Sequence, residues 1–271
     1  MKVFAIYDEG LDWKDPVGYL FHYERSNSFI IELNPNLSEW EAPLLFSSYV
    51  KKGIYTIPKE SSILWVRERV IPSGRQNIGL ILKNHKMNEY DEMKLLLASK
   101  GKCSQDQCYI KEIRYDEVSQ TIKERSRDNI SECFVSDDFS IICLFDDNTV
   151  RKIDLRKIEP VNEKIRHVLK NRALFESVEV GVGGYSITFN DSIEVEKRDL
   201  IEKGKVIDIS AQDFYRFVSQ NTVDTGKVCD MLECTKQNVA YLVKKERLKP
   251  IKNGLKENIF FKGNIEKNMW D

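Results

Sequence analysis

The side chains best suited to chemistry in this 271-residue chain lie together near its C-terminal end. Lys236, Gln237 and Asn238 directly follow Thr235, a residue type that caps helix N-termini. Gln and Asn can each make two hydrogen bonds to adenine, and Lys can bond guanine. In the first turn of a helix, three such side chains can reach base edges in a DNA groove. We therefore expect Thr235 to cap a DNA-reading helix.

The charge of the surrounding segment fits a polyanionic ligand. Between Cys234 and Lys267, nine basic and three acidic residues give a local charge of +6, whereas the whole chain carries −1. The remaining candidate contacts are Tyr241, Lys244 and Lys245, which suit phosphate groups, and Lys252, Asn253 and Lys256 on the segment that follows. A basic patch of this kind is the electrostatic footprint of nucleic-acid binding.

Short helices and a hairpin must position these side chains. The pattern predicts helices over residues 213–220, 226–233 and 236–245, and a hairpin over residues 248–261 that turns at Asn253 and Gly254. Thr225 and Thr235 stand where two of the helices need N-caps. The apolar positions that such a helix pair would bury are Val228, Leu232, Val239, Leu242 and Val243.

This segment, TGKVCDMLECTKQNVAYLVKKERLKPI over residues 225–251, resembles the helix-turn-helix of MerR-type and phage-excisionase-type regulators. The likeness extends over residues 223–267. It implies that the second helix enters the major groove and that Leu248, Lys249 and Pro250 lead into a short wing. It also implies double-stranded DNA as the partner and, because such proteins usually face a two-fold operator, a homodimer.

Two other interpretations stay open for the same residues. The lysines could be the solvated face of an ordinary helical tail. The helix-turn-helix could also bind a protein, as some winged domains do.

The first 114 residues predict an α+β domain with a small antiparallel sheet. Strand-like runs cover residues 2–7, 17–23 and 29–33, and helical spacing follows over residues 37–50, 61–70, 74–84 and 89–99. Trp13, Trp40 and Trp65 are expected as core or interface anchors. Arg67, Arg69 and Arg75 are expected at the surface, although they could cluster around an anion.

The residues LWVRERVIPSGRQNIGLIL (64–82) and LLLASKGKCSQDQCYI (95–110) resemble the region that precedes the kinase core in HipA-like toxin kinases. No catalytic or metal-binding motif of such a core follows. Residues 115–128 are rich in charge and suit a linker.

Residues 129–206 predict a small β-rich domain. A hairpin turns at residues 146–148, and further strands flank Gly181, Gly183 and Gly184, which we interpret as a β-turn and not as a phosphate cradle. The region resembles a small bacterial domain of unknown function that occurs beside helix-turn-helix domains. The residues that carry this likeness are Phe145, Asp146, Asp154, Leu174, Phe175, Phe189 and Asn190.

Several classes are excluded by composition and motifs. The chain has no run of 18 apolar residues that would predict a membrane span, and its first residues do not have the pattern of a signal peptide. Six dispersed cysteines and three scattered histidines predict reduced thiols in a cytoplasm and no metal or cofactor. No catalytic motif is present, so we do not expect an enzyme.

The sequence thus predicts a bacterial, cytoplasmic, multidomain α+β protein: an N-terminal domain over 1–114, a β-rich domain over 129–206 and a winged helix-turn-helix over 207–271. The expected function is sequence-specific DNA binding that controls transcription of its own operon, with an operon of toxin–antitoxin type as one candidate. The alternative is an antitoxin-like adaptor whose N-terminal domain binds a partner protein.

Overall fold

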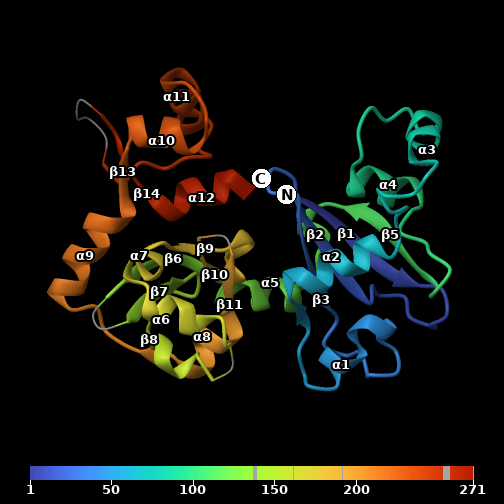
Figure 1. The fold of residues 1–271 in the computed structure, drawn as a ribbon, viewed down its shortest axis with the longest axis horizontal. Coiled ribbons are helices and arrows are strands. Elements are labelled where there is room, and N and C mark those ends of the chain that lie inside the picture. The colour runs from blue at the N-terminus through green and yellow to red at the C-terminus, as the bar shows by residue number, and fades with distance from the viewer. Residues whose placement is uncertain (137–138, 161, 191, 253–256, 271) are drawn as a thin grey trace. The chain divides into compact units, whose positions relative to one another are not determined.

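The chain folds into two compact units, Met1–Ile122 and Lys123–Asp271. The computed structural model describes residues 1–136, 139–160, 162–190, 192–252 and 257–270 (Figure 1). Each unit combines helices with antiparallel strands, which confirms the α+β part of the predicted fold class. The regions 129–206 and 207–271 both lie in the second unit, so their separation into two domains stays a prediction.

A five-stranded antiparallel sheet forms the centre of the first unit. Its strands are β1 (Lys2–Asp8), β2 (Gly18–Tyr23), β3 (Ser28–Leu33), β4 (Thr56–Ile57) and β5 (Cys108–Ile113), in the order β4-β3-β2-β1-β5. The first three match the predicted strands within one residue. Strand β5 was not predicted, because it pairs with β1, which lies far from it in the sequence. The register of this pair is Val3↔Ile113.

Helices of this unit supply the rest of its core. They are η1 (Leu44–Phe46), α1 (Ser47–Val50), α2 (Lys59–Arg67), α3 (Ile78–Asn84), α4 (Glu92–Ala98) and η2 (Tyr115–Glu117), and α5 (Gln120–Arg125) crosses the boundary between the units. The predicted helix over 37–50 begins only at Leu44. Pro43 is the reason, because proline lacks the N–H that a helix needs and disfavours helical backbone in the residue before it.

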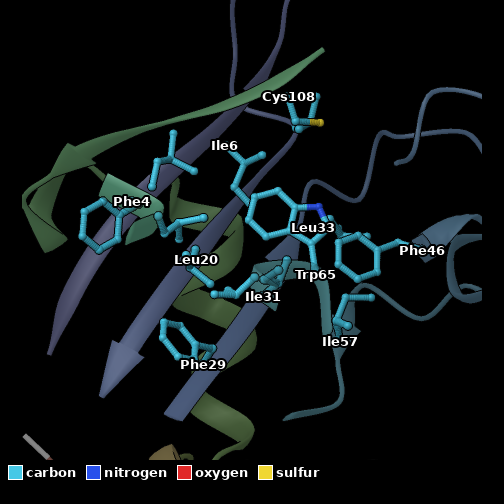
Figure 2. Close-up of a cluster of buried hydrophobic side chains, with 14 of the residues drawn as sticks. Phe4, Ile6, Leu20, Phe29, Ile31, Leu33, Phe46, Ile57, Trp65 and Cys108 are labelled. Atoms are coloured by element: carbon cyan, nitrogen blue, oxygen red, sulfur yellow. The ribbon is translucent and has the colours of Figure 1, made fainter. Parts of the chain in front are cut away.

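Trp65 from α2 is fully buried in this core, against Phe46 at 6.4 Å between ring centroids (Figure 2). Trp13 packs against the core in part, but Trp40 is 88% exposed and is not a core residue. Arg69, predicted at the surface, is instead buried: its guanidinium lies 3.7 Å from the centroid of the Trp65 ring and pairs with Asp106. A cation at this depth requires both partners, so Arg69 supports the core.

The β-rich part of the second unit holds two small sheets. One has the order β12-β8-β7-β6 and the other β11-β10-β9. Their strands are β6 (Ile130–Val135), β7 (Ser140–Phe145), β8 (Val150–Asp154), β9 (Val178–Val180), β10 (Ser186–Phe189), β11 (Ile193–Glu196) and β12 (Lys205–Val206). The accompanying helices are η3 (Ser126–Asp128), η4 (Leu155–Lys157), α6 (Ile165–Lys170), α7 (Arg172–Glu176), η5 (Val182–Gly184) and α8 (Lys197–Lys203).

The glycine-rich stretch forms a tight turn, as predicted. Gly183 and Gly184 have φ angles of 68° and 73°, in the left-handed region that glycine tolerates. A Cβ atom on Gly184 would lie 2.5 Å from the carbonyl oxygen of Ile130. The glycines therefore allow close backbone approach between η5 and β6. Among the described residues, no helix is long and apolar enough to cross a bilayer.

Candidate nucleic-acid interface

The last part of the chain alternates helices with short strands. Its elements are α9 (Ala211–Asn221), β13 (Thr222–Asp224), α10 (Thr225–Met231), α11 (Lys236–Lys244), β14 (Ile259–Phe261) and α12 (Lys262–Trp270) (Figure 1). The three predicted helices are present, with ends shifted by at most two residues. α10 and α11 contact each other, as a helix pair joined by a tight turn must.

A small apolar core holds these elements together. Its buried members are Val228, Leu232, Val239, Leu248, Phe260 and Ile265. Val228, Leu232 and Val239 were predicted, and the predicted Leu242 and Val243 pack against this core in part. Phe260 lies in β14 and Ile265 lies in α12. The sequence of these two elements does not indicate to which core their apolar residues belong.

Strand β14 has a partner that the sequence did not indicate. It pairs antiparallel with β13, in the register Thr222↔Phe261 and Asp224↔Ile259. The predicted hairpin over 248–261 is present in part, because Ile259 also forms a bridge with Lys252. Its predicted turn at Asn253 and Gly254 lies outside the described residues.

Asp224 and Thr235 provide the N-caps of α10 and α11. Thr235 caps α11 as predicted, since its Oγ1 accepts a hydrogen bond from the Asn238 N–H at 3.3 Å. The predicted cap Thr225 is wrong: the Asp224 carboxylate accepts from the Lys227 N–H at 2.8 Å and caps α10 instead. β13 ends at Asp224 in extended backbone, so the helix starts one residue earlier than the threonine suggested.

This difference predicts a stability result. Asp224→Ala should destabilise the second unit by about 1 kcal/mol, because it removes an acceptor and a negative charge from a helix N-terminus. Thr225→Ala should cost less, since the Thr225 hydroxyl makes only a 3.4 Å bond to the Asn258 carbonyl. Urea unfolding of both variants measures the difference, and a larger loss in Thr225→Ala would contradict the assigned cap.

The predicted base-contacting residues share the exposed start of α11. Gln237 and Asn238 are exposed, while the neighbouring Val239 is buried. Lys236 is exposed too, but its Nζ pairs with Glu257 Oε1 at 2.8 Å. This pair raises the pKa of Lys236, first through its hydrogen bond and then through its charge. Lys236 is thus less available for a base than the two amides.

The residues predicted to contact phosphates lie further along the same helix. Tyr241, Lys244 and Lys245 are all exposed, and the Lys245 ammonium lies 5.8 Å from the centroid of the Tyr241 ring. We define the α11 face as Gln237, Asn238, Tyr241, Lys244 and Lys245. Lys252 is exposed at the bridge to Ile259, whereas Asn253 and Lys256 lie outside the described residues.

Helix α9 attaches this assembly to the β-rich sheet. Phe217 lies between Phe134 of β6 and Phe261 of β14, with ring centroids 5.5 and 5.2 Å away. The Gln220 amide bonds both backbone groups of Val135, accepting from its N–H at 3.1 Å and donating to its carbonyl at 3.2 Å. The end of α9 thereby extends the hydrogen bonding of β6.

A single carboxylate of β6 binds both ends of the segment. Glu132 Oε2 accepts from the Asn221 amide at 2.8 Å, and Glu132 Oε1 accepts from the Gly263 N–H at 2.9 Å. Gly263 is required here, because a Cβ would lie 2.2 Å from the Ser131 carbonyl oxygen. We call Glu132, Asn221 and Gly263 the carboxylate clamp. In the sequence Glu132 is an ordinary strand residue, and nothing local indicated this role.

Burial dominates the ionisation of the clamp. It raises the pKa of Glu132 to about 7, and the nearby Glu266 adds to this, while the hydrogen bonds from Asn221 and Gly263 act in the opposite direction. The pKa of Glu266 is raised by burial as well, against the effect of Lys262, whose Nζ lies 3.3 Å from its carboxylate. Two acidic groups therefore have raised pKa values: Glu132, which contacts the start of α12, and Glu266 within that helix.

Metal ligands and surface depressions are the other features that bear on ligand binding. The described residues contain no group of three or more His, Cys, Asp or Glu side chains that could hold a metal ion. An open depression in the first unit is lined by Glu39, Trp40, Ala42, Leu44, Ser47, Ser48 and Lys51. The arrangement best suited to bind a ligand of definite chemistry is the α11 face, with amides at its start and lysines at its end.

Neither a protein-family model, nor a curated protein, nor a solved structure matches this chain.

Proposed function

We propose that this protein binds double-stranded DNA in a sequence-specific manner and regulates transcription of its own operon. The observation that carries the proposal is the α11 face, which presents Gln237 and Asn238 at a capped helix start and Lys244 and Lys245 one to two turns later. Amides at the start of a helix can read bases, and lysines further along can bind phosphates.

The dimensions of α11 suit the major groove. An α-helix with its side chains is about 10–12 Å in diameter, and the major groove is about 12 Å wide, so α11 can lie in it. Val239 faces the small core, so the exposed side of the helix is left free for DNA. The pairing of β13 with β14 and the bridge between Lys252 and Ile259 support a wing after α11.

A homodimer is part of the proposal, because two copies would present two α11 helices to a two-fold operator. Light scattering of the purified chain measures this directly. A monomer that stays monomeric on its operator would remove the dimer from the proposal.

The test is fluorescence-anisotropy binding of the full chain to its own upstream DNA and to a scrambled duplex of the same composition, over a salt series. Asn238→Ala should weaken binding to the upstream duplex by about 5- to 150-fold, the worth of one bidentate base contact. Binding to the scrambled duplex should not change. The variant keeps the backbone N–H that bonds Thr235.

Two further variants separate base reading from phosphate binding. Lys245→Ala should weaken both duplexes alike and reduce the salt slope by about one. Lys170→Ala, an exposed lysine at the end of α6 in the same unit, is the matched control and should change neither. Equal, weak binding to both duplexes, unaffected by Asn238→Ala, would refute sequence-specific DNA binding.

The second candidate is a protein-interaction adaptor that acts through the first unit. It is favoured by Trp40 and Leu44, which are 88% and 90% exposed and line the same depression. Large apolar side chains in contact with water favour a protein partner. Trp40→Ala should abolish partner capture under this function and leave DNA binding unchanged, whereas the α11 variants should do the reverse.

A further inference from the structure

The turn between α10 and α11 has a specific backbone geometry. The Cys234 N–H bonds the Cys229 carbonyl at 3.0 Å, and the Glu233 N–H bonds the Asp230 carbonyl at 3.4 Å. Glu233 between them has a φ of 50°, in the left-handed region. These two bonds and the left-handed residue define a Schellman motif, in which Cys229 is the third residue from the helix end and Cys234 the second residue beyond it.

This motif places the two cysteines at positions whose side chains often meet. A contact between residues at these positions frequently accompanies a Schellman motif. Here both are cysteines, both are half-buried, and both pack against the core that holds α10 and α11. The pKa of the Cys229 thiol is raised first by burial and next by Cys234, as expected for neighbouring thiols.

The backbone geometry of the turn favours a disulfide between the two cysteines. A bridge needs Cα atoms about 4.4–6.8 Å apart, and the hydrogen bond from the Cys234 N–H to the Cys229 carbonyl keeps the two backbones close. The two residues also enclose only four others, so the bridge closes a short loop within one turn of chain.

The other cysteines are less suited to this chemistry. Cys133 and Cys143 oppose each other on β6 and β7, but they are 6% and 0% exposed and burial raises the pKa of both thiols. The thiols of Cys103 and Cys108 point to different carboxylates, Asp106 and Asp8, each at 3.6 Å. Cys229 and Cys234 are both partly open to solvent, and a backbone hydrogen bond joins the two residues directly.

We propose that Cys229 and Cys234 form a reversible dithiol–disulfide couple that reacts with small disulfides such as oxidised glutathione. One cysteine thiolate attacks a sulfur of the small disulfide and expels half of it as a thiolate. The second cysteine thiolate then attacks the resulting mixed disulfide and expels the other half. The protein loses two electrons and two protons, and the small disulfide becomes two thiols.

Such a couple makes the turn before α11 responsive to the redox state of the cell. Disulfides in reducing compartments are usually transient and redox-sensing. The chemistry depends only on the two thiols and goes beyond DNA binding.

The experiment is peptide mass spectrometry of the full chain after incubation with oxidised glutathione at mildly alkaline pH. Free thiols are blocked under denaturing conditions before trypsin digestion. Cleavage after lysine and arginine places each pair in one peptide: residues 103–111, 128–151 and 228–236. The result is therefore read separately for all three pairs in one sample.

We expect the peptide 228–236 to be two hydrogen atoms lighter than its reduced form and to carry no blocking group. The other two peptides should keep two blocked thiols, and dithiothreitol should restore the reduced form. Cys234→Ser should stop at the mixed disulfide, with one glutathione on Cys229. Two blocked thiols or two glutathiones on peptide 228–236 in the unmodified chain would overturn the proposal, as would preferential oxidation of another pair.

Discussion

Trp65→Ala should lower the free energy of unfolding of the first unit by about 3–5 kcal/mol, which is much of the stability of a domain of this size. Trp65 is fully buried and contacts Phe46 and the Arg69 guanidinium. Its removal leaves a large cavity and also uncovers a buried cation, and both effects act in the same direction.

Native-state hydrogen exchange of the full chain measures this loss in peptides of residues 1–122. Trp40→Ala is the matched control, because Trp40 is 88% exposed and should change stability by less than about 0.5 kcal/mol. Trp65→Phe should recover part of the loss by refilling the cavity. Equal effects of the two alanine variants would contradict the placement of the tryptophans.

The second unit should lose stability as the pH rises from about 4.5 to about 7, because of the carboxylate clamp. The pKa of Glu132 is about 7 in the folded chain, above its ordinary value of 4.5. Below pH 4.5 Glu132 is protonated in both the folded and the unfolded chain, so it does not lower the free energy of unfolding. Between these values the unfolded chain releases the proton and the folded chain keeps it, so stability falls as the pH rises.

The loss is complete above pH 7 and amounts to roughly 3 kcal/mol, from a pKa difference of about two and a half units. Glu266, whose pKa is also raised, contributes with the same sign.

Urea unfolding between about pH 5 and pH 8 tests this dependence. Glu132→Gln should flatten most of it, since a glutamine does not ionise. Glu179→Gln is the control: Glu179 pairs with Lys262 at 2.8 Å beside the same helix but is half exposed, and its variant should keep the slope. An unchanged slope in Glu132→Gln would assign the pH dependence to another group.

Elements with a local pattern could be predicted closely from the sequence. Strands β1, β2 and β3 alternate or cluster β-branched and aromatic residues between turn signals, and α11 was predicted within one residue. The cap at Thr235 followed from residue type alone. In these cases the structure is decided by interactions between residues that are close together in the sequence.

What depends on distant partners could not be predicted. The three residues of β13 carry no signal of their own and form a strand because β14 lies beside them. That pairing moved the cap of α10 from Thr225 to Asp224. Likewise, Arg69 is buried because its guanidinium lies over the Trp65 ring and pairs with Asp106. Glu132 forms the carboxylate clamp because Asn221 and Gly263 donate hydrogen bonds to it.

The meeting of both ends of residues 222–262 at Glu132 has a consequence for how such a chain could arise. A segment whose ends are adjacent can be inserted into, or removed from, a host without separating the flanking strands and helices. The antiparallel pair β13–β14 closes the segment, and the six-residue core lies within it or directly beyond it. Recombination could thus transfer residues 222–262 as one segment, provided that the recipient offers a buried carboxylate at the junction and an apolar residue in the place of Ile265.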